Sequence, residues 1–84
     1  MAWHVYIVEC CDGTLYTGIS DDVPKRVAAH NSGRGAKYTR GHTPVVLRYY
    51  EACPDRSSAL RREAALKRLS RTQKWDLIAR EGEK

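Results

Sequence analysis

The 84-residue chain contains no phenylalanine and only three cysteines. Cys10 and Cys11 are adjacent, Cys53 is left over, and no C-x-x-C pair occurs, so the sequence indicates neither a disulfide framework nor a zinc site. We therefore expect free, apolar cysteines in a reducing compartment, which means a cytoplasmic protein without a disulfide partner. No apolar run approaches the ~20 residues of a membrane-spanning helix, and no signal-peptide pattern is present, so we expect no membrane partner.

Acidic residues are scarce in two long parts of the chain. Residues 25–48 contain six Lys and Arg and no Asp or Glu, and residues 56–74 contain seven with a single acid, Glu63. The whole chain has 15 basic and 10 acidic residues, a formal charge of +5. Two separate basic blocks favour a polyanionic partner, with nucleic acid ahead of an acidic membrane surface. The alternative is a set of solvated helix faces that keep a small protein soluble.

The rest of the composition is that of one folded domain. Hydrophobic residues make up 42% of the sequence, which excludes a disordered or low-complexity chain. A chain of this length has room for one core, so we expect a single domain over residues 1–84, with its core at about residues 3–80.

Three helices are expected, and each has a recognisable cap. The Asp21-Asp22 pair can cap a helix that has Pro24 in its first turn and ends at about residue 30. The Ser57-Ser58 pair can cap a second helix that runs to residue 69, and Ser70 a third that runs to about residue 80. Strands are expected at residues 3–10, 14–20 and 45–51, with an ordered loop at 32–44. This ββαβαα order predicts an α+β fold, a small, mostly antiparallel three-stranded sheet flanked by helices.

The turn of the first hairpin decides where two tyrosines point. A two-residue loop at residues 12–13 would send Tyr6 and Tyr16 to opposite faces of the sheet. A three-residue loop at residues 11–13, with a left-handed glycine at its end, pairs Tyr6 with Gly18 and places both tyrosines on one face. Only the second register assembles a site.

The spacing of these residues resembles that of a known enzyme family. Val5-Tyr6-Ile7 is followed ten residues later by Tyr16-Thr17-Gly18, Arg26 lies in the first helix, and Glu63 lies in the middle of the long helix. This arrangement resembles the GIY-YIG nuclease superfamily. It looks most like the small stand-alone UPF0213 or YhbQ-like branch, and the resemblance runs from about His4 to Ile78.

The resemblance implies endonuclease-type, metal-dependent hydrolysis of phosphodiester bonds in DNA or RNA, with DNA favoured. In that picture Tyr6 activates or positions the attacking water, and Tyr16 hydrogen-bonds near the scissile phosphate. Gly18 lets the substrate backbone approach, and Arg26 neutralises phosphate charge. Glu63 holds one divalent metal, Mg²⁺ or Mn²⁺, which suits a single carboxylate because these ions keep waters and share phosphate ligands.

Further residues complete the expected site. The resemblance places His30 and Tyr38 in the same pocket. The glycine-containing loop at residues 33–43 could track a phosphate backbone, with Tyr38 stacking on a base. The residues expected to bind nucleic acid are Arg34, Lys37, Tyr38, Arg40 and Lys67.

Three of the expected site residues also have an ordinary structural interpretation. Arg26 could be a solvated helix charge, and His30 could interact with the end of its helix. Glu63 and Lys67 are four residues apart and could form an ion pair worth about 0.3–0.5 kcal/mol.

The sequence also departs from the family pattern. Val5 stands where the first motif has Gly, and Ile19 stands where several members have Lys. Many members have an Asn after the metal-binding Glu, whereas the only Asn here is Asn31. The alternative function is therefore a non-catalytic nucleic-acid-binding module on the same fold. A third possibility, a protein-interaction adaptor that uses the basic helices, rests on charge alone.

Overall fold

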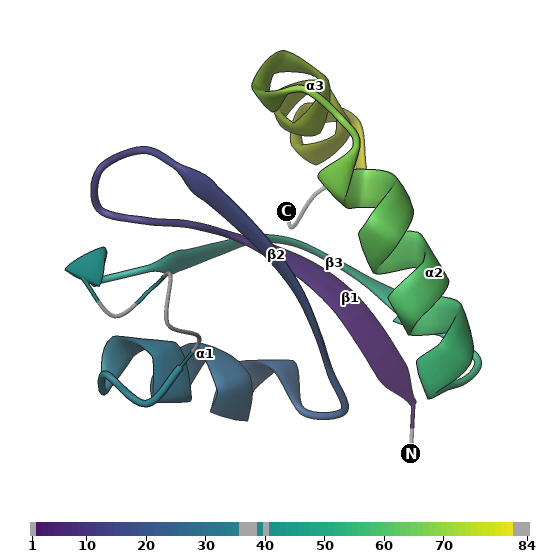
Figure 1. Cartoon of the computed structure of the whole chain (residues 1–84), viewed down its shortest axis with the longest axis horizontal. Coiled ribbons are helices and arrows are strands. Elements are labelled where there is room, and N and C mark those ends of the chain that lie inside the picture. The colour runs from purple at the N-terminus through teal and green to yellow at the C-terminus, as the bar shows by residue number, and fades with distance from the viewer. Residues whose placement is uncertain (1, 36–38, 40, 82–84) are drawn as a thin grey trace.

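The computed structural model describes residues 2–35, 39 and 41–81. Its elements follow the expected ββαβαα order (Figure 1). They are β1 (Trp3–Glu9), β2 (Leu15–Ser20), α1 (Val23–Asn31), β3 (Val46–Cys53), α2 (Arg56–Lys67) and α3 (Arg71–Glu81). None of the helices in the described ranges has the length and apolar character needed to cross a bilayer.

The three strands form one antiparallel sheet in the order β2-β1-β3, so β1 is central. In the first hairpin Tyr6 pairs with Gly18 and Val8 with Tyr16. The turn closes through Cys10, whose N–H donates to the carbonyl of Thr14 at 2.8 Å. The three-residue loop is thus confirmed, and its last residue, Gly13, has the left-handed φ of 87° that this turn requires.

The two faces of the sheet bury different cores, because successive residues of β1 point to opposite sides. Val5 and Ile7 pack with residues of α2 and α3, including Leu66 and Leu77. On the other face lies a second cluster around α1, formed by Tyr6, Val8, Cys10, Val23 and Val45. Figure 1 shows the sheet between α1 and the α2–α3 pair.

The helix caps confirm two of the three expectations and correct one. Asp22 caps α1 by accepting from the Lys25 N–H at 3.1 Å, and Ser70 exchanges hydrogen bonds with Gln73 at the start of α3. The prediction that Ser57 or Ser58 caps α2 is wrong. Asp55 does so instead, because its extended backbone lets its carboxylate accept from the Ser58 N–H at 2.7 Å.

A polar cluster fixes α2 against β3. Glu51 of β3 accepts a hydrogen bond from the hydroxyl of Tyr49 and pairs with Arg62 of α2, whose Nε lies 3.1 Å from Oε2. Burial and the neighbouring carboxylate raise the pKa of Tyr49 to about 12, so it stays a hydrogen-bond donor. Since Arg62 precedes Glu63 in the chain, this cluster also fixes the part of α2 that carries Glu63.

Candidate active site

The centre of the candidate site is the hydroxyl of Tyr6. Tyr6 is 1% exposed and extends from β1 across the neighbouring strand β2 at Gly18. A Cβ atom at residue 18 would lie 2.6 Å from the hydroxyl oxygen of Tyr6, well inside contact distance. The side chain of Tyr6 therefore fills the space beside Gly18. Residue 18 is a glycine because a larger side chain would collide with Tyr6.

Tyr6 is held by a buried histidine from α1. The hydroxyl of Tyr6 lies 2.8 Å from Nε2 of His30, and Nδ1 of His30 lies 2.8 Å from the hydroxyl of Thr39. Both His30 and Thr39 are 0% exposed. Gly35 closes the other side, since a Cβ there would lie 2.2 Å from Nδ1 of His30. The ring of His30 is thus fixed between β1 and the loop after α1. Both ring nitrogens bond to side chains there, so His30 does not cap its own helix.

The imidazole of His30 is neutral at neutral pH. Burial lowers its pKa, and the positive charge of Arg26 lowers it further. A neutral imidazole has one nitrogen that donates and one that accepts, which leaves two arrangements. In one, Tyr6 donates to Nε2. In the other, Nε2–H donates to Tyr6, and the hydroxyl proton of Tyr6 is directed away from His30.

Tyr16 contacts the same histidine from β2. Its ring meets that of His30 edge-on, with centroids 5.5 Å apart and an interplanar angle of 67°. Tyr6 and His30 make a similar contact, with centroids 6.0 Å apart. The hairpin register has therefore brought both motif tyrosines to one face of the sheet and against one side chain, as expected from the three-residue loop.

Arg26 lies one turn before His30 in α1 and is half-buried. Burial raises the pKa of Tyr6, and Arg26 opposes this through a hydrogen bond and its positive charge. The charges of Tyr16 and Glu63 also raise the pKa of Tyr6. The net effect is a raised pKa, so Tyr6 is a phenol rather than a phenolate at neutral pH.

Glu63 lies at the border of the buried face of α2, where its side chain is 19% exposed. Its carboxylate is 3.4 Å from Nζ of Lys67, so the ordinary ion pair does form. The negative charge of Glu63 makes the smallest contribution to the raised pKa of Tyr6. In the described ranges no group of three or more His, Cys, Asp and Glu is placed to hold a metal ion. The donor set thus fits only an ion that brings waters or substrate oxygens as most of its ligands.

The other expected residues are less informative. Lys37, Tyr38 and Arg40 lie outside the described residues. Arg34 is exposed, with its Nε 3.3 Å from the hydroxyl of Ser32, and the side chain of Lys67 is 53% exposed.

Thr39 and Gly35 were missed by sequence reasoning, although both surround His30. The only signal in the sequence was Gly35, a glycine close behind His30, where a loop can approach the histidine ring. Asn31, the one asparagine in the sequence, has a structural role: its side chain donates to the carbonyl of Val45 at 3.2 Å and accepts from the Val45 N–H at 2.6 Å. The side chain of Asn31 is thus occupied by the backbone at the start of β3.

Relatives of known classification match almost the whole chain. The family described as the GIY-YIG catalytic domain matches residues 2–76. A UPF0213 protein of Halobacterium salinarum is 61% identical over 75 residues, which cover 89% of this chain and 97% of the relative. A UPF0213 protein of Staphylococcus haemolyticus is 52% identical over 93% of this chain and 96% of its own length.

Solved structures agree with these matches. The solution structure of a UPF0213 protein of Bacillus halodurans has 46% identity and a TM-score of 0.63, over 98% of this chain and 87% of that one. The structure of an E. faecalis protein has 35% identity and a TM-score of 0.61, over 94% and 85%. The family match and the relatives point to the same family, and the structure places Tyr6, Tyr16 and Gly18 on one hairpin, as the family motifs imply. The chain belongs to the GIY-YIG family of nuclease domains and is similar to proteins named UPF0213.

Proposed function

We propose that this protein is a metal-dependent nuclease that hydrolyses phosphodiester bonds, in DNA in preference to RNA. The observation that carries the proposal is the placement of the Tyr6 hydroxyl. It is buried and hydrogen-bonded to His30, and the charges of Arg26 and Glu63 act on its pKa. Two neighbouring buried groups with shifted pKa values, Tyr6 and His30, are typical of functional sites.

In this mechanism Tyr6 and His30 handle the proton of the attacking water. Because the raised pKa keeps Tyr6 protonated, the residue does not wait as a phenolate. In the tautomer whose Nε2 accepts from Tyr6, the hydroxyl oxygen of Tyr6 would take a proton from the attacking water while its own proton passes to Nε2, 2.8 Å away. The lowered pKa of His30 keeps the imidazole neutral before the reaction. The imidazolium is stabilised when negative charge builds up on the phosphate during the reaction.

Arg26 and Tyr16 act on the phosphate itself. The guanidinium of Arg26 can meet two phosphate oxygens at once, which a lysine cannot do. Tyr16 lies against His30 on the same face, so its hydroxyl can donate to an oxygen near the scissile bond. Interactions of this kind accelerate the reaction when they strengthen as charge develops in the transition state.

Glu63 is the residue that would hold one divalent metal, Mg²⁺ or Mn²⁺. When bound, the metal would supply positive charge for the phosphate oxygens and the leaving oxygen. Glu63 must first exchange its ion-pair partner Lys67, whose exposed ammonium is then available for a phosphate of the substrate. Further contacts to nucleic acid are expected from Arg34, and from Lys37, Tyr38 and Arg40 outside the described residues.

A second candidate function is a nucleic-acid-binding module without catalysis. The ion pair between Glu63 and Lys67 favours it, because this pair occupies the one carboxylate offered to the metal. The absence of an Asn after Glu63 points the same way.

The deciding experiment incubates the purified protein with end-labelled single-stranded, double-stranded and branched DNA and matched RNA. Each substrate is tested with Mg²⁺, with Mn²⁺ and with excess chelator. We expect cleavage that requires the metal and is lost in Glu63→Gln. Salt-sensitive binding without cleavage, in every metal condition, would support the binding module instead.

A further inference from the structure

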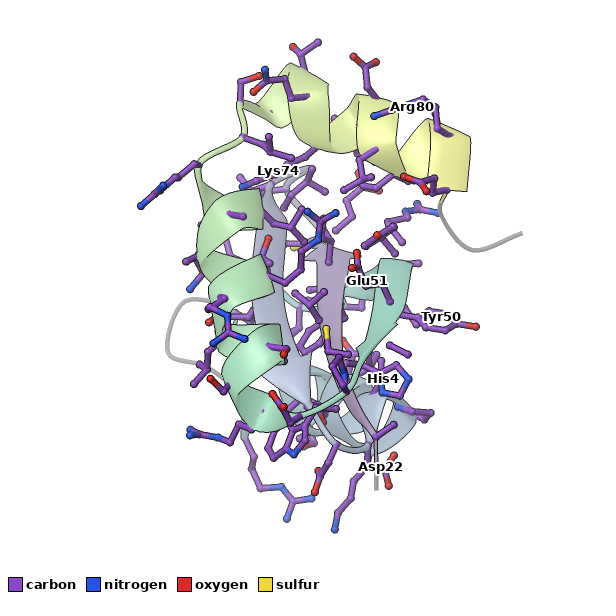
Figure 2. All side chains as sticks on the ribbon, turned by 90° about the vertical axis from the view of Figure 1, so that its right-hand side faces the viewer. His4, Asp22, Tyr50, Glu51, Lys74 and Arg80 are labelled. Atoms are coloured by element: carbon purple, nitrogen blue, oxygen red, sulfur yellow. The ribbon has the colours of Figure 1, made fainter. Side chains whose placement is uncertain are left out.

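A concave site lies between α1 and β3, where it shares Val23 and Leu47 with the apolar cluster around Tyr6. It is a hollow of about 400 Å³, a size typical of ligand pockets. His4 of β1, Asp21 and Asp22 before α1, and Leu47 and Tyr50 of β3 form its wall. Figure 2 looks toward this edge of the molecule and shows Tyr50 projecting outward, with His4 and Asp22 on the same side.

Two polar side chains that line this hollow, those of His4 and Asp21, keep a polar group without a partner in the described part of the chain. Nδ1 of His4 is buried and has no hydrogen-bond partner among the described residues. The carboxylate of Asp21 likewise has no partner in the described ranges, and it is exposed. Asp22 uses Oδ1 to cap α1. Two carboxylates and a histidine therefore border one cavity, in a protein whose net charge is +5.

The rest of the lining is aromatic and apolar. The side chain of Tyr50 is 48% exposed, and its ring meets that of His4 edge-on at a centroid distance of 6.2 Å. Val23, Pro24 and Leu47 add apolar surface. Carboxylates beside an exposed aromatic ring are suited to an organic cation, whose alkyl stem can pack on such a surface.

The strand beside the hollow is accessible as well. β3 is one of the two outer strands of the sheet, so its far edge carries no strand of the described chain. Val46 is as exposed as Tyr50, and both belong to β3. An outer strand with exposed apolar side chains is a common binding edge for an extended peptide.

We propose that this hollow binds an arginine side chain of a partner protein whose extended segment lies along β3. The planar guanidinium can stack on Tyr50 while it pairs with the carboxylate of Asp21, which a lysine ammonium does less well. A guanine base could form similar contacts, but the attached phosphates would then lie beside Asp21 and Asp22, and like charges oppose this. The proposal does not depend on nuclease activity.

The test uses the ¹⁵N-labelled full-length protein and the capped tripeptide acetyl-Gly-Arg-Gly-amide. A matched peptide has citrulline in place of arginine, which keeps the shape and removes the charge. We expect saturable shifts of the amide signals of His4, Asp21, Asp22 and Tyr50 with the arginine peptide. Binding of the citrulline peptide should be at least about tenfold weaker, because the ion pair and the cation–π contact are lost.

Variants locate the site. Asp21→Asn and Tyr50→Leu should each weaken binding of the arginine peptide, whereas Asp76→Asn, which removes an exposed acid on α3, should not. The spectra themselves show whether each variant is folded. Equal binding of both peptides, or shifts outside the hollow, would overturn the proposal. So would guanosine saturating these signals when the arginine peptide does not.

Discussion

Tyr6 and Gly18 face each other across the β1–β2 ladder, and the hydroxyl of Tyr6 occupies the space that a side chain on residue 18 would need. Gly18, the glycine of the second motif, thus leaves the space in which Tyr6, the tyrosine of the first motif, lies. The orientation of Tyr6 toward His30 depends on an absent side chain as much as on a hydrogen bond.

We predict that Gly18→Ala displaces the ring of Tyr6 and breaks its bond to His30. The new methyl group would lie 2.6 Å from the hydroxyl oxygen of Tyr6. Overpacking of this kind costs about 1–3 kcal/mol, and cleavage should fall sharply as well. Urea unfolding and cleavage assays measure the two effects. Gly41→Ala is the control for stability, because a Cβ at residue 41 has no neighbour within 4 Å, and it should leave the free energy of unfolding unchanged.

We predict that Tyr6→Phe slows cleavage while the chain stays folded. The change removes one hydroxyl, retains the ring and leaves Nε2 of buried His30 without its partner. An unpaired buried polar group costs about 1–3 kcal/mol. Tyr50→Phe is the matched control, since that residue is half-exposed. A cleavage rate equal to that of the wild type would exclude the role of the hydroxyl.

We predict that Glu63→Gln abolishes metal-dependent cleavage and leaves nucleic-acid binding intact or slightly stronger. The amide is a poor ligand for Mg²⁺, and removal of a negative charge does not weaken a surface that binds phosphates. The lost ion pair with Lys67 should cost only about 0.3–0.5 kcal/mol of stability. Glu81→Gln, an exposed acid of α3, serves as control. Unchanged cleavage in Glu63→Gln would place the metal elsewhere or point to a contaminant.

Stability should fall with acidification in a way that depends on His30. Its pKa is lowered in the folded protein, so the unfolded chain takes up a proton first as the pH falls. This residue therefore contributes stability above an unfolded pKa of about 6.5, and the contribution is lost between that value and the lower folded pKa. Urea unfolding at several pH values between 8 and 5 measures the effect. His30→Gln should show a shallower decline than the wild type, and parallel curves would contradict the prediction.

Nucleic-acid binding should depend strongly on salt. If about five basic side chains neutralise phosphates, the slope of log K against log[salt] should lie near −3.5 to −4.5. Arg34→Ala should make the slope less negative by about 0.7–0.9, whereas Arg80→Ala, outside the two basic blocks, should not change it. Fluorescence anisotropy at several salt concentrations gives the slopes. A slope near zero would leave the basic blocks as solubility devices.

The sequence predicted the hairpin well because its geometry is local. A glycine at residue 13 allows the left-handed φ, and this one turn sets the register that brings Tyr6 opposite Gly18. The position of Thr39 against His30 could not be predicted in this way. It depends on the path of a loop, which many weak contacts determine together. Asp55 was missed as the cap of α2 for a smaller reason: two serines compete for that position in the sequence, and the carboxylate just before the helix forms the bond.

The double hydrogen bond between Asn31 and the backbone of Val45 has a consequence for the loop it spans. By accepting from one backbone group and donating to the other, the amide imitates a strand partner and joins the end of α1 to the start of β3. The intervening segment therefore starts and finishes at one fixed point, and it carries Gly35 and Thr39, which hold His30. Exchanging this segment between relatives while keeping these two residues offers a direct way to alter substrate choice while the chemistry stays in place.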